Sequence, residues 1–216
     1  DHWIGRVFDA LKRSGQWNNT LVIFTSDHAE QLGDHHLMGK LGWFDQSYHL
    51  PLIIRDPDGA KGRVVAAPTE AVDLMPTILD RLGLDVPRSC DGVSLTPWLA
   101  GDTPRVWRDA VHFEFDLRGG WPRAGDPPLG LPMDEAGLCV MRTADWKYVH
   151  CPSLPPILYD LRNDPDEMRN VADDPAYAHV MTEAAQRMLS WRMRHADRAL
   201  TQFCATPTGL KDRLAG

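Results

Sequence analysis

The stretch LVIFTSDHAEQLGDHHLMGK, residues 21–40, joins an apolar run to a dense cluster of charged and imidazole side chains. Its first four residues are apolar throughout, which is typical of a strand buried on both faces of a parallel sheet. Asp27 and His28 follow almost at once, at the carboxyl end of that strand, where open parallel sheets bind their ligands. The sequence therefore predicts a strand that leads into a binding site.

Asp27 and His28 together suit a divalent cation. The carboxylate supplies charge and a hard oxygen, whereas the neutral imidazole supplies a nitrogen that favours Mn, Zn or Fe over Ca or Mg. Two ligands do not complete a metal site, so further ligands must come from elsewhere. In the alternative interpretation Asp27 caps a following helix with an acidic first turn, and His28 is only polar surface. The spacing alone leaves both interpretations open.

The segments around this stretch predict an α/β domain over residues 1–105. Apolar residues at helical spacing indicate a helix over 4–11, and a second apolar run at 51–54 indicates another buried strand. A further helix is predicted over 72–82, with Asp73 as its cap and a proline in its first turn, where proline is tolerated. Helices that alternate with apolar strands indicate part of a parallel-sheet α/β fold.

The pattern changes after Gly101. Apolar and polar residues alternate over 111–115 and 139–143, and residues 146–149 follow after a turn, as in antiparallel strands with one wet face. A helix is predicted to begin after Asp174-Pro175, and its apolar stripe comprises Tyr177, Met181, Ala184, Met188 and Trp191. We therefore predict a small antiparallel sheet-and-helix subdomain over residues 106–201.

Two segments carry little regular pattern. Residues 118–137 are rich in Gly and Pro and predict a long loop, which is a lid, an arm to a neighbouring subunit or a plain surface loop. Residues 202–216 read as a tail.

Composition limits the function classes. The 216 residues are 43% hydrophobic and 25% charged, as in ordinary globular proteins, and a formal net charge of -7 argues against non-specific nucleic-acid binding. No apolar stretch approaches the roughly 20 residues that span a bilayer, and no basic-plus-apolar leader is present. The four cysteines are scattered and form no CxxC pair, which favours reduced thiols. We expect a cytoplasmic protein with neither a membrane nor a nucleic-acid partner.

The combined motifs resemble the sulfatase branch of the alkaline phosphatase superfamily. The resemblance rests on residues 19–40 and on the following segment, residues 40–57 (KLGWFDQSYHLPLIIRDP). It continues through shorter segments: VDLMPTILD at 72–80, DGVSL at 91–95, RTADWKY at 142–148 and LYDL at 158–161. Within the branch, His28 and these segments look most like phosphonate monoester hydrolases and arylsulfatases. The resemblance implies the C-terminal part of an alkaline-phosphatase-like α/β sandwich.

The resemblance also implies roles for the residues of the opening stretch. Asp27 and His28 would be ligands of one divalent ion, Mn, Zn or Ca, and the imidazole favours Mn. Lys40 would place its ammonium against an oxygen of a phosphoryl or sulfuryl group and stabilise the charge there; otherwise it is a solvated loop residue between glycines. His35 and His36 would contact substrate, support such contacts or lie on the surface.

Members of this branch attack with a formylglycine made from Cys or Ser in a C/S-x-P-S-R motif. None of the four cysteines stands in that motif; after Cys151 the proline comes one position early and no arginine follows. The chain also begins at Asp1 without an initiator Met. We therefore expect a C-terminal fragment of a larger hydrolase whose formylglycine lies upstream, and we expect no turnover from this chain alone. Exposed edges of the 21–25 strand predict self-association, and we expect a homo-oligomer.

The resemblance implies hydrolysis of a small anionic ester: a phosphonate monoester, a phosphodiester or a sulfate ester. Two alternatives remain. The first is a two-metal phosphatase or nucleotide pyrophosphatase of the same superfamily, which would carry a further ligand His downstream and lack a lysine at position 40. The second is a non-catalytic interaction module in which Asp27 only caps a helix. Metal binding and the role of Lys40 separate these hypotheses.

Overall fold

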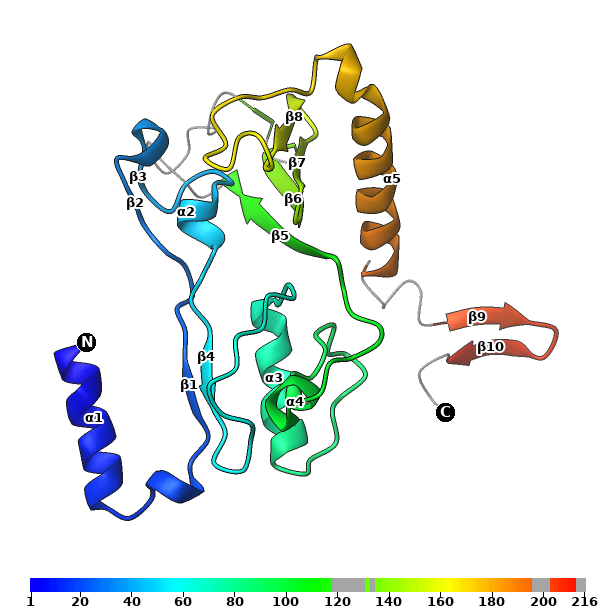
Figure 1. Cartoon of the computed structure of the whole chain (residues 1–216). Coiled ribbons are helices and arrows are strands. Elements are labelled where there is room, and N and C mark those ends of the chain that lie inside the picture. Colours follow the sequence, from blue (N-terminus) through cyan, green and yellow to red (C-terminus); the bar gives the residue numbers. More distant parts are fainter. Residues whose placement is uncertain (118–130, 133–134, 196–202, 213–216) are drawn as a thin grey trace. The chain divides into compact units, whose positions relative to one another are not determined.

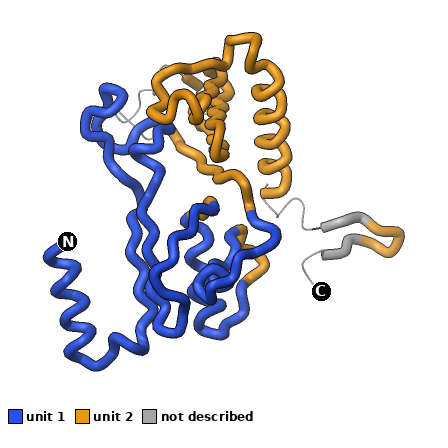
Figure 2. The backbone as a smooth tube through the Cα atoms, viewed as in Figure 1, with its two compact units in different colours: residues 1–67, 71–86, 92–107 blue, residues 68–70, 87–91, 108–216 orange. Residues whose placement is uncertain are grey.

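The computed structural model describes residues 1–117, 131–132, 135–195 and 203–212. Figure 1 shows its helices and strands, and Figure 2 shows two compact units. Unit 1 comprises residues 1–67, 71–86 and 92–107, and unit 2 comprises residues 68–70, 87–91 and 108–216. No helix in these described segments is long and apolar enough to cross a bilayer.

Unit 1 begins with helix α1 (His2–Arg13), followed by a 3-10 turn and strand β1 (Val22–Phe24). This confirms the predicted first helix and strand. Strand β4 (Ile53–Arg55) pairs with β1, and Ile23 lies opposite Ile54. The sequence predicted strands of a parallel sheet, but this pair is antiparallel and forms a two-stranded sheet within the described part of the chain. The chain reverses between β1 and β4, so the two strands meet in opposite directions.

The segment between β1 and β4 contains three short elements. Strand β2 (Gln31–Leu32) and strand β3 (Met38–Gly39) form an antiparallel hairpin, and a 3-10 turn (Asp34–His36) joins them. Helix α2 (Asp45–Tyr48) then precedes β4. All the residues that the sequence singled out as site candidates lie between β1 and α2 (Figure 1).

The rest of unit 1 contains helix α3 (Leu74–Arg81) and helix α4 (Thr96–Ala100). Pro76 lies in the first turn of α3, as predicted, and is buried. Asp73 stands at the N-cap position but makes no side-chain capping bond; its carboxylate instead accepts a 2.8 Å hydrogen bond from the backbone N–H of Val93. The predicted cap is therefore wrong in its chemistry, because Asp73 joins α3 to a distant loop.

Unit 2 contains a four-stranded antiparallel sheet in the order β5-β6-β7-β8. Its strands are β5 (Ala110–Asp116), β6 (Gly137–Thr143), β7 (Trp146–Cys151) and β8 (Leu154–Asp160). Helix α5 (Ala178–Arg194) packs on this sheet, and its buried residues Val180, Ala184 and Met188 join Met141, Tyr148 and Leu158 in one core. Figure 1 shows α5 running alongside the sheet. The three predicted strands and the predicted helix are confirmed.

The predicted loop and the predicted tail both belong to unit 2. Most of the predicted loop, residues 118–130 and 133–134, lies outside the described residues. Strand β9 (Phe203–Thr206) pairs antiparallel with β10 (Gly209–Asp212), so part of the predicted tail forms a hairpin.

Candidate metal and anion site

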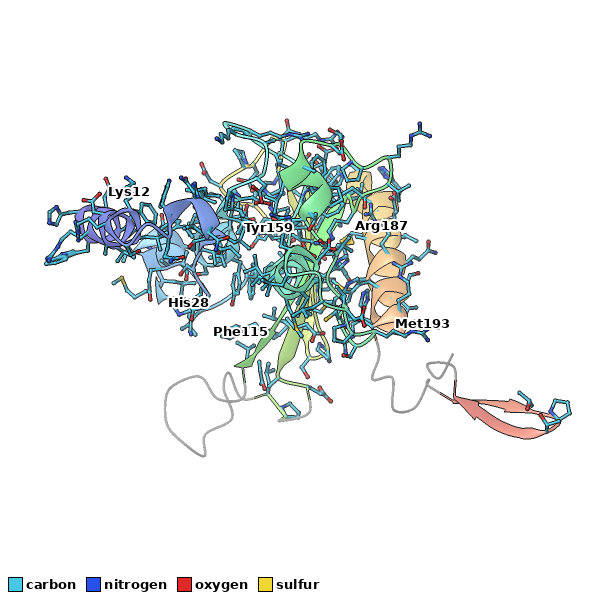
Figure 3. All side chains as sticks on the ribbon, turned by 90° about the horizontal axis from the view of Figure 1, so that it is seen from below. Lys12, His28, Phe115, Tyr159, Arg187 and Met193 are labelled. Atoms are coloured by element: carbon cyan, nitrogen blue, oxygen red, sulfur yellow. The ribbon has the colours of Figure 1, made fainter. Side chains whose placement is uncertain are left out.

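Asp27 and His28 lie in the connection between β1 and β2. Residues 25–30 contain no helix, and the next helical turn starts only at Asp34. The alternative in which Asp27 caps a following helix is therefore wrong. Figure 3 labels His28 in this connecting segment. The two side chains come from adjacent residues, and their geometry decides whether they can share an ion.

Two atoms of this pair face a common point. Oδ2 of Asp27 lies 3.6 Å from Nε2 of His28. Ligands bonded to one transition ion at about 2.0–2.2 Å stand about 3–3.5 Å apart, so a small closure would bring both atoms onto one ion. The donor set of one carboxylate oxygen and one imidazole nitrogen therefore fits a divalent metal.

The second nitrogen of His28 is already engaged. Nδ1 lies 3.0 Å from the carbonyl oxygen of Ala29. A carbonyl can only accept a hydrogen bond, so this contact requires the proton on Nδ1 and leaves the Nε2 lone pair free for an ion. Histidine ligands of metals ordinarily make such a bond with their other nitrogen, which fixes the tautomer and the orientation of the ring. The orientation of the His28 ring therefore suits metal binding through Nε2.

The carboxyl of Asp27 is ionised at neutral pH. A hydrogen bond from its own backbone lowers its pKa below the usual value, and the charge of Lys40 acts more weakly in the same direction. The side chain is 87% exposed, whereas that of His28 is 28% exposed.

The β2–β3 hairpin brings Lys40 back toward Asp27. Gln31 lies opposite Gly39, and Lys40 follows Gly39 directly. The twelve residues that separate Asp27 from Lys40 in the sequence are therefore folded back on themselves. Gly39 and Gly42 both have φ in the left-handed region, at 81° and 86°, which glycine adopts without steric cost. The two glycines allow the sharp course of the chain on either side of Lys40.

His35 and His36 form the turn of this hairpin. Both have positive φ values, 52° and 60°, which are uncommon for residues other than glycine. The ring of His35 stacks on Phe44 with centroids 3.6 Å apart, so it packs against its own loop. His36 is exposed. Substrate contact by either residue stays a prediction.

Sequence reasoning missed the contribution of α2. The backbone N–H of Ala29 donates to the carbonyl of Ser47 at 2.9 Å, and the hydroxyl of Tyr48 donates to the carbonyl of Lys40 at 3.3 Å. Two successive residues of one helix thus hold the segment that carries Asp27 and the segment that carries Lys40.

Asp27 and His28 do not by themselves make a complete metal site. Among the residues that the structure describes, no group of three or more His, Cys, Asp or Glu side chains is gathered where it could hold an ion. Gln31 and Ser47 are fully buried, and neither the side-chain amide of Gln31 nor the hydroxyl of Ser47 has a hydrogen-bond partner within the described segments. Both residues adjoin the candidate site, since Gln31 pairs with Gly39 and Ser47 holds Ala29.

Comparison with known proteins gives one consistent family. A sulfatase family model matches residues 1–84. The multifunctional alkaline phosphatase superfamily protein PehA of Trinickia caryophylli is 47% identical over 215 residues, which is 99% of this chain and 42% of that protein. Choline-sulfatase of Rhizobium meliloti is 31% identical over 209 residues.

Comparison with solved structures points to the same family. The crystal structure of a phosphonate monoester hydrolase of Agrobacterium radiobacter matches with a TM-score of 0.86 and 46% identity, and the alignment covers 97% of this chain and 42% of that one. The chain spans about two fifths of the length of the relatives it matches most extensively. The matched part is their C-terminal portion, as the resemblance in the sequence implied. Residues 1–84 therefore carry a sulfatase family domain, and nearly the whole chain is similar to a protein of the alkaline phosphatase superfamily.

Proposed function

We propose that the complete protein is a metal-dependent hydrolase of phosphonate monoesters, phosphodiesters or sulfate esters, and that this chain carries two of its metal ligands and one cationic group. Asp27 and His28 would hold one divalent ion, most readily Mn. The remaining ligands and a formylglycine nucleophile would come from the part of the protein outside these residues. Relatives named as phosphonate monoester hydrolase and choline-sulfatase support a hydrolase of this class.

The observation that carries the proposal is the pairing of Asp27 with His28. Their facing atoms lie 3.6 Å apart, and the other nitrogen of the imidazole is turned to a carbonyl. When bound, the ion would polarise the ester and stabilise negative charge. Asp27 would bind and orient it through an ionised carboxylate, and His28 would bind it through a neutral nitrogen.

Lys40 would contact the anionic group of the substrate. The β2–β3 hairpin returns the chain toward Asp27, so the lysine and the proposed ion would contact the same tetrahedral group. An ammonium is a compact point charge suited to one oxygen atom, and it would stabilise the charge on that oxygen as the leaving group departs. A lysine at this position favours the proposal over a two-metal phosphatase.

The test uses the full-length protein and its Asp27→Asn variant. We expect the parent protein to contain close to one equivalent of tightly bound divalent metal for this site and to hydrolyse at least one of three aryl esters: a phenylphosphonate monoester, a phosphodiester or a sulfate. We expect the variant to lose both the metal and turnover while it stays folded by circular dichroism. A folded variant with the metal content and rates of the parent would refute the assignment.

A further inference from the structure

The last two residues of α2 each make a hydrogen bond to a segment that carries candidate site residues: one to the segment of Asp27 and His28, the other to the segment of Lys40. Ser47 accepts the N–H of Ala29, one residue after His28, and Tyr48 donates to the carbonyl of Lys40. The bond from Ser47 uses its backbone carbonyl, so it depends little on the side chain. The bond from Tyr48 uses the phenol hydroxyl, so a single atom can be removed to test it.

The backbone at Lys40 has few other constraints nearby. Gly39 and Gly42 are both left-handed, and glycine has more backbone freedom to lose than any other residue. Gly39 is the last residue of β3, so the strand pairing ends just before Lys40. The carbonyl of Lys40 is the point at which the hydroxyl of Tyr48 fixes this glycine-flanked loop.

The environment of Tyr48 suits a permanent donor. The side chain is partly buried, and desolvation raises the pKa of its hydroxyl to about 12. The phenol therefore keeps its proton through the neutral and moderately alkaline range, and it can donate to a carbonyl throughout. The other end of the residue is held by α2, whose neighbouring Ser47 is fully buried.

We propose that Tyr48 is a positioning residue for Lys40: its hydroxyl fixes the backbone from which the lysine reaches the anionic group of the substrate. The proposal rests on the function proposed above for Lys40. Tyr48 itself would contact neither substrate nor metal. It restricts the arc over which a long, flexible side chain can swing, and small misplacements of a charged group reduce its effect on the transition state.

The first measurement compares steady-state kinetics of the full-length parent and its Tyr48→Phe variant. We expect kcat to fall about tenfold, which corresponds to the loss of one hydrogen bond, with little change in KM and unchanged metal content. Tyr177→Phe is the matched control, because its hydroxyl also makes one long bond, 3.4 Å to Asp160, in unit 2. We expect the control to keep the kcat of the parent.

A double-mutant cycle separates positioning from general loosening. If Tyr48 acts through Lys40, then Tyr48→Phe should lower kcat less than about twofold when Lys40→Ala is already present. A full tenfold loss of kcat in the Lys40→Ala background would overturn the proposal. The proposal would also fail if Tyr48→Phe kept the kcat of the parent while Lys40→Ala was strongly impaired. If Lys40→Ala itself were neutral, the proposed function of Lys40 would fail first, and the role of Tyr48 would fail with it.

Discussion

Lys40 has two features that distinguish it from the other lysines of the described chain: it lies between two left-handed glycines, and its charge lowers the pKa of Asp27. Replacing it with Ala in the full-length protein should reduce kcat/KM about 10²- to 10³-fold, the usual loss when one preorganised charge-stabilising group is removed. Metal content should stay the same, because the lysine is no ligand. Steady-state kinetics with metal analysis checks both parts.

The control for Lys40 is Lys12→Ala. Lys12 is an exposed lysine on α1 that pairs with Asp9, and its removal should leave kcat/KM unchanged. Equal rates in Lys40→Ala and the parent would contradict the role given to Lys40.

His28 should determine which metal supports activity. In His28→Asn an amide oxygen replaces the imidazole nitrogen, so we expect the preference to move from Mn or Zn toward Ca. The measurement is reactivation of the chelator-treated enzyme with each ion in turn. His36→Asn is the matched control, since that side chain is exposed and should leave the order of ions unchanged. The same ion preference in His28→Asn as in the parent would argue against direct ligation.

Some of this residue-level detail could be predicted from the sequence, and some could not. Asp27, His28 and Lys40 could be singled out because charged groups after an apolar strand are unusual and matched a known pattern. The bond from Asp73 to Val93 could not be predicted, because the sequence shows only a good capping residue at a helix start. Tyr48 was missed for a similar reason: its partner is a backbone carbonyl, which no sequence pattern marks.

At the scale of elements, His112 joins β5 to α5. Its ring stacks on Trp191 with centroids 4.6 Å apart, and its backbone N–H donates to Glu70. Burial, followed by the charges of His195 and nearby arginines, lowers the pKa of His112 from 6.5 to about 4. Between these two values the unfolded chain binds a proton that the folded chain does not. The contribution of His112 to the free energy of unfolding is therefore fully present above pH 6.5, and it decreases as the pH falls toward 4.

The His112→Phe variant tests this linkage. Phenylalanine keeps an aromatic ring against Trp191 but cannot titrate. The melting temperature of the variant should therefore fall less than that of the parent between pH 7 and pH 4.5. The full contribution of His112 is at most about 3 kcal/mol, from 1.36 kcal/mol for each pKa unit. Calorimetry at the two pH values measures the difference. Parallel pH profiles in the two proteins would show that His112 does not carry the effect.

A buried ion pair lies in the same unit. Lys147 on β7 and Glu167 in the loop after β8 contact each other with side chains 0% and 1% exposed. Lys147→Met would leave the carboxylate of Glu167 without this cation in the interior, which should lower the free energy of unfolding by about 3–5 kcal/mol. Lys147→Met with Glu167→Leu should cost much less than the two single changes added together. Denaturant unfolding of all three variants completes the cycle.

The exposed pair Lys12–Asp9 is the reference for that cycle, because surface pairs contribute about 0–1 kcal/mol. Additive losses at Lys147 and Glu167 would mean that the two side chains do not depend on each other.

The elements themselves were predicted unevenly. Strands β5 to β7 and helix α5 showed clear alternation or helical spacing, and the structure contains them. Strand β8 was hidden by Pro155 and Pro156, but it lies at the edge of the sheet, where a missing N–H is tolerated. The direction of β1 relative to β4 could not be predicted, since an apolar run marks burial and says nothing about the neighbour. That direction depends on the short hairpin and helix between the strands.

At the scale of the whole molecule, large apolar side chains of unit 1 remain exposed. They include Trp3 and Val7 on α1, and Val72, Met75 and Leu82 in and around α3. Apolar faces of this kind normally pack against other protein surface. The chain covers 42% of the length of PehA and of the phosphonate monoester hydrolase, so we propose that the remainder of the complete protein covers these faces.

The 216-residue chain by itself should therefore associate in solution. Sedimentation velocity over a concentration series should show a rising average mass, because exposed apolar surface and unpaired strand edges favour contacts between copies. A Met75→Lys, Leu82→Lys variant should shift the series toward monomer, whereas Lys61→Glu, which changes charge without removing apolar surface, should leave it unchanged. A monomer at every concentration would mean that the exposed face of α3 is stable in water. Association that persists unchanged in the double variant would place the contact on α1 or on the β1–β4 edges.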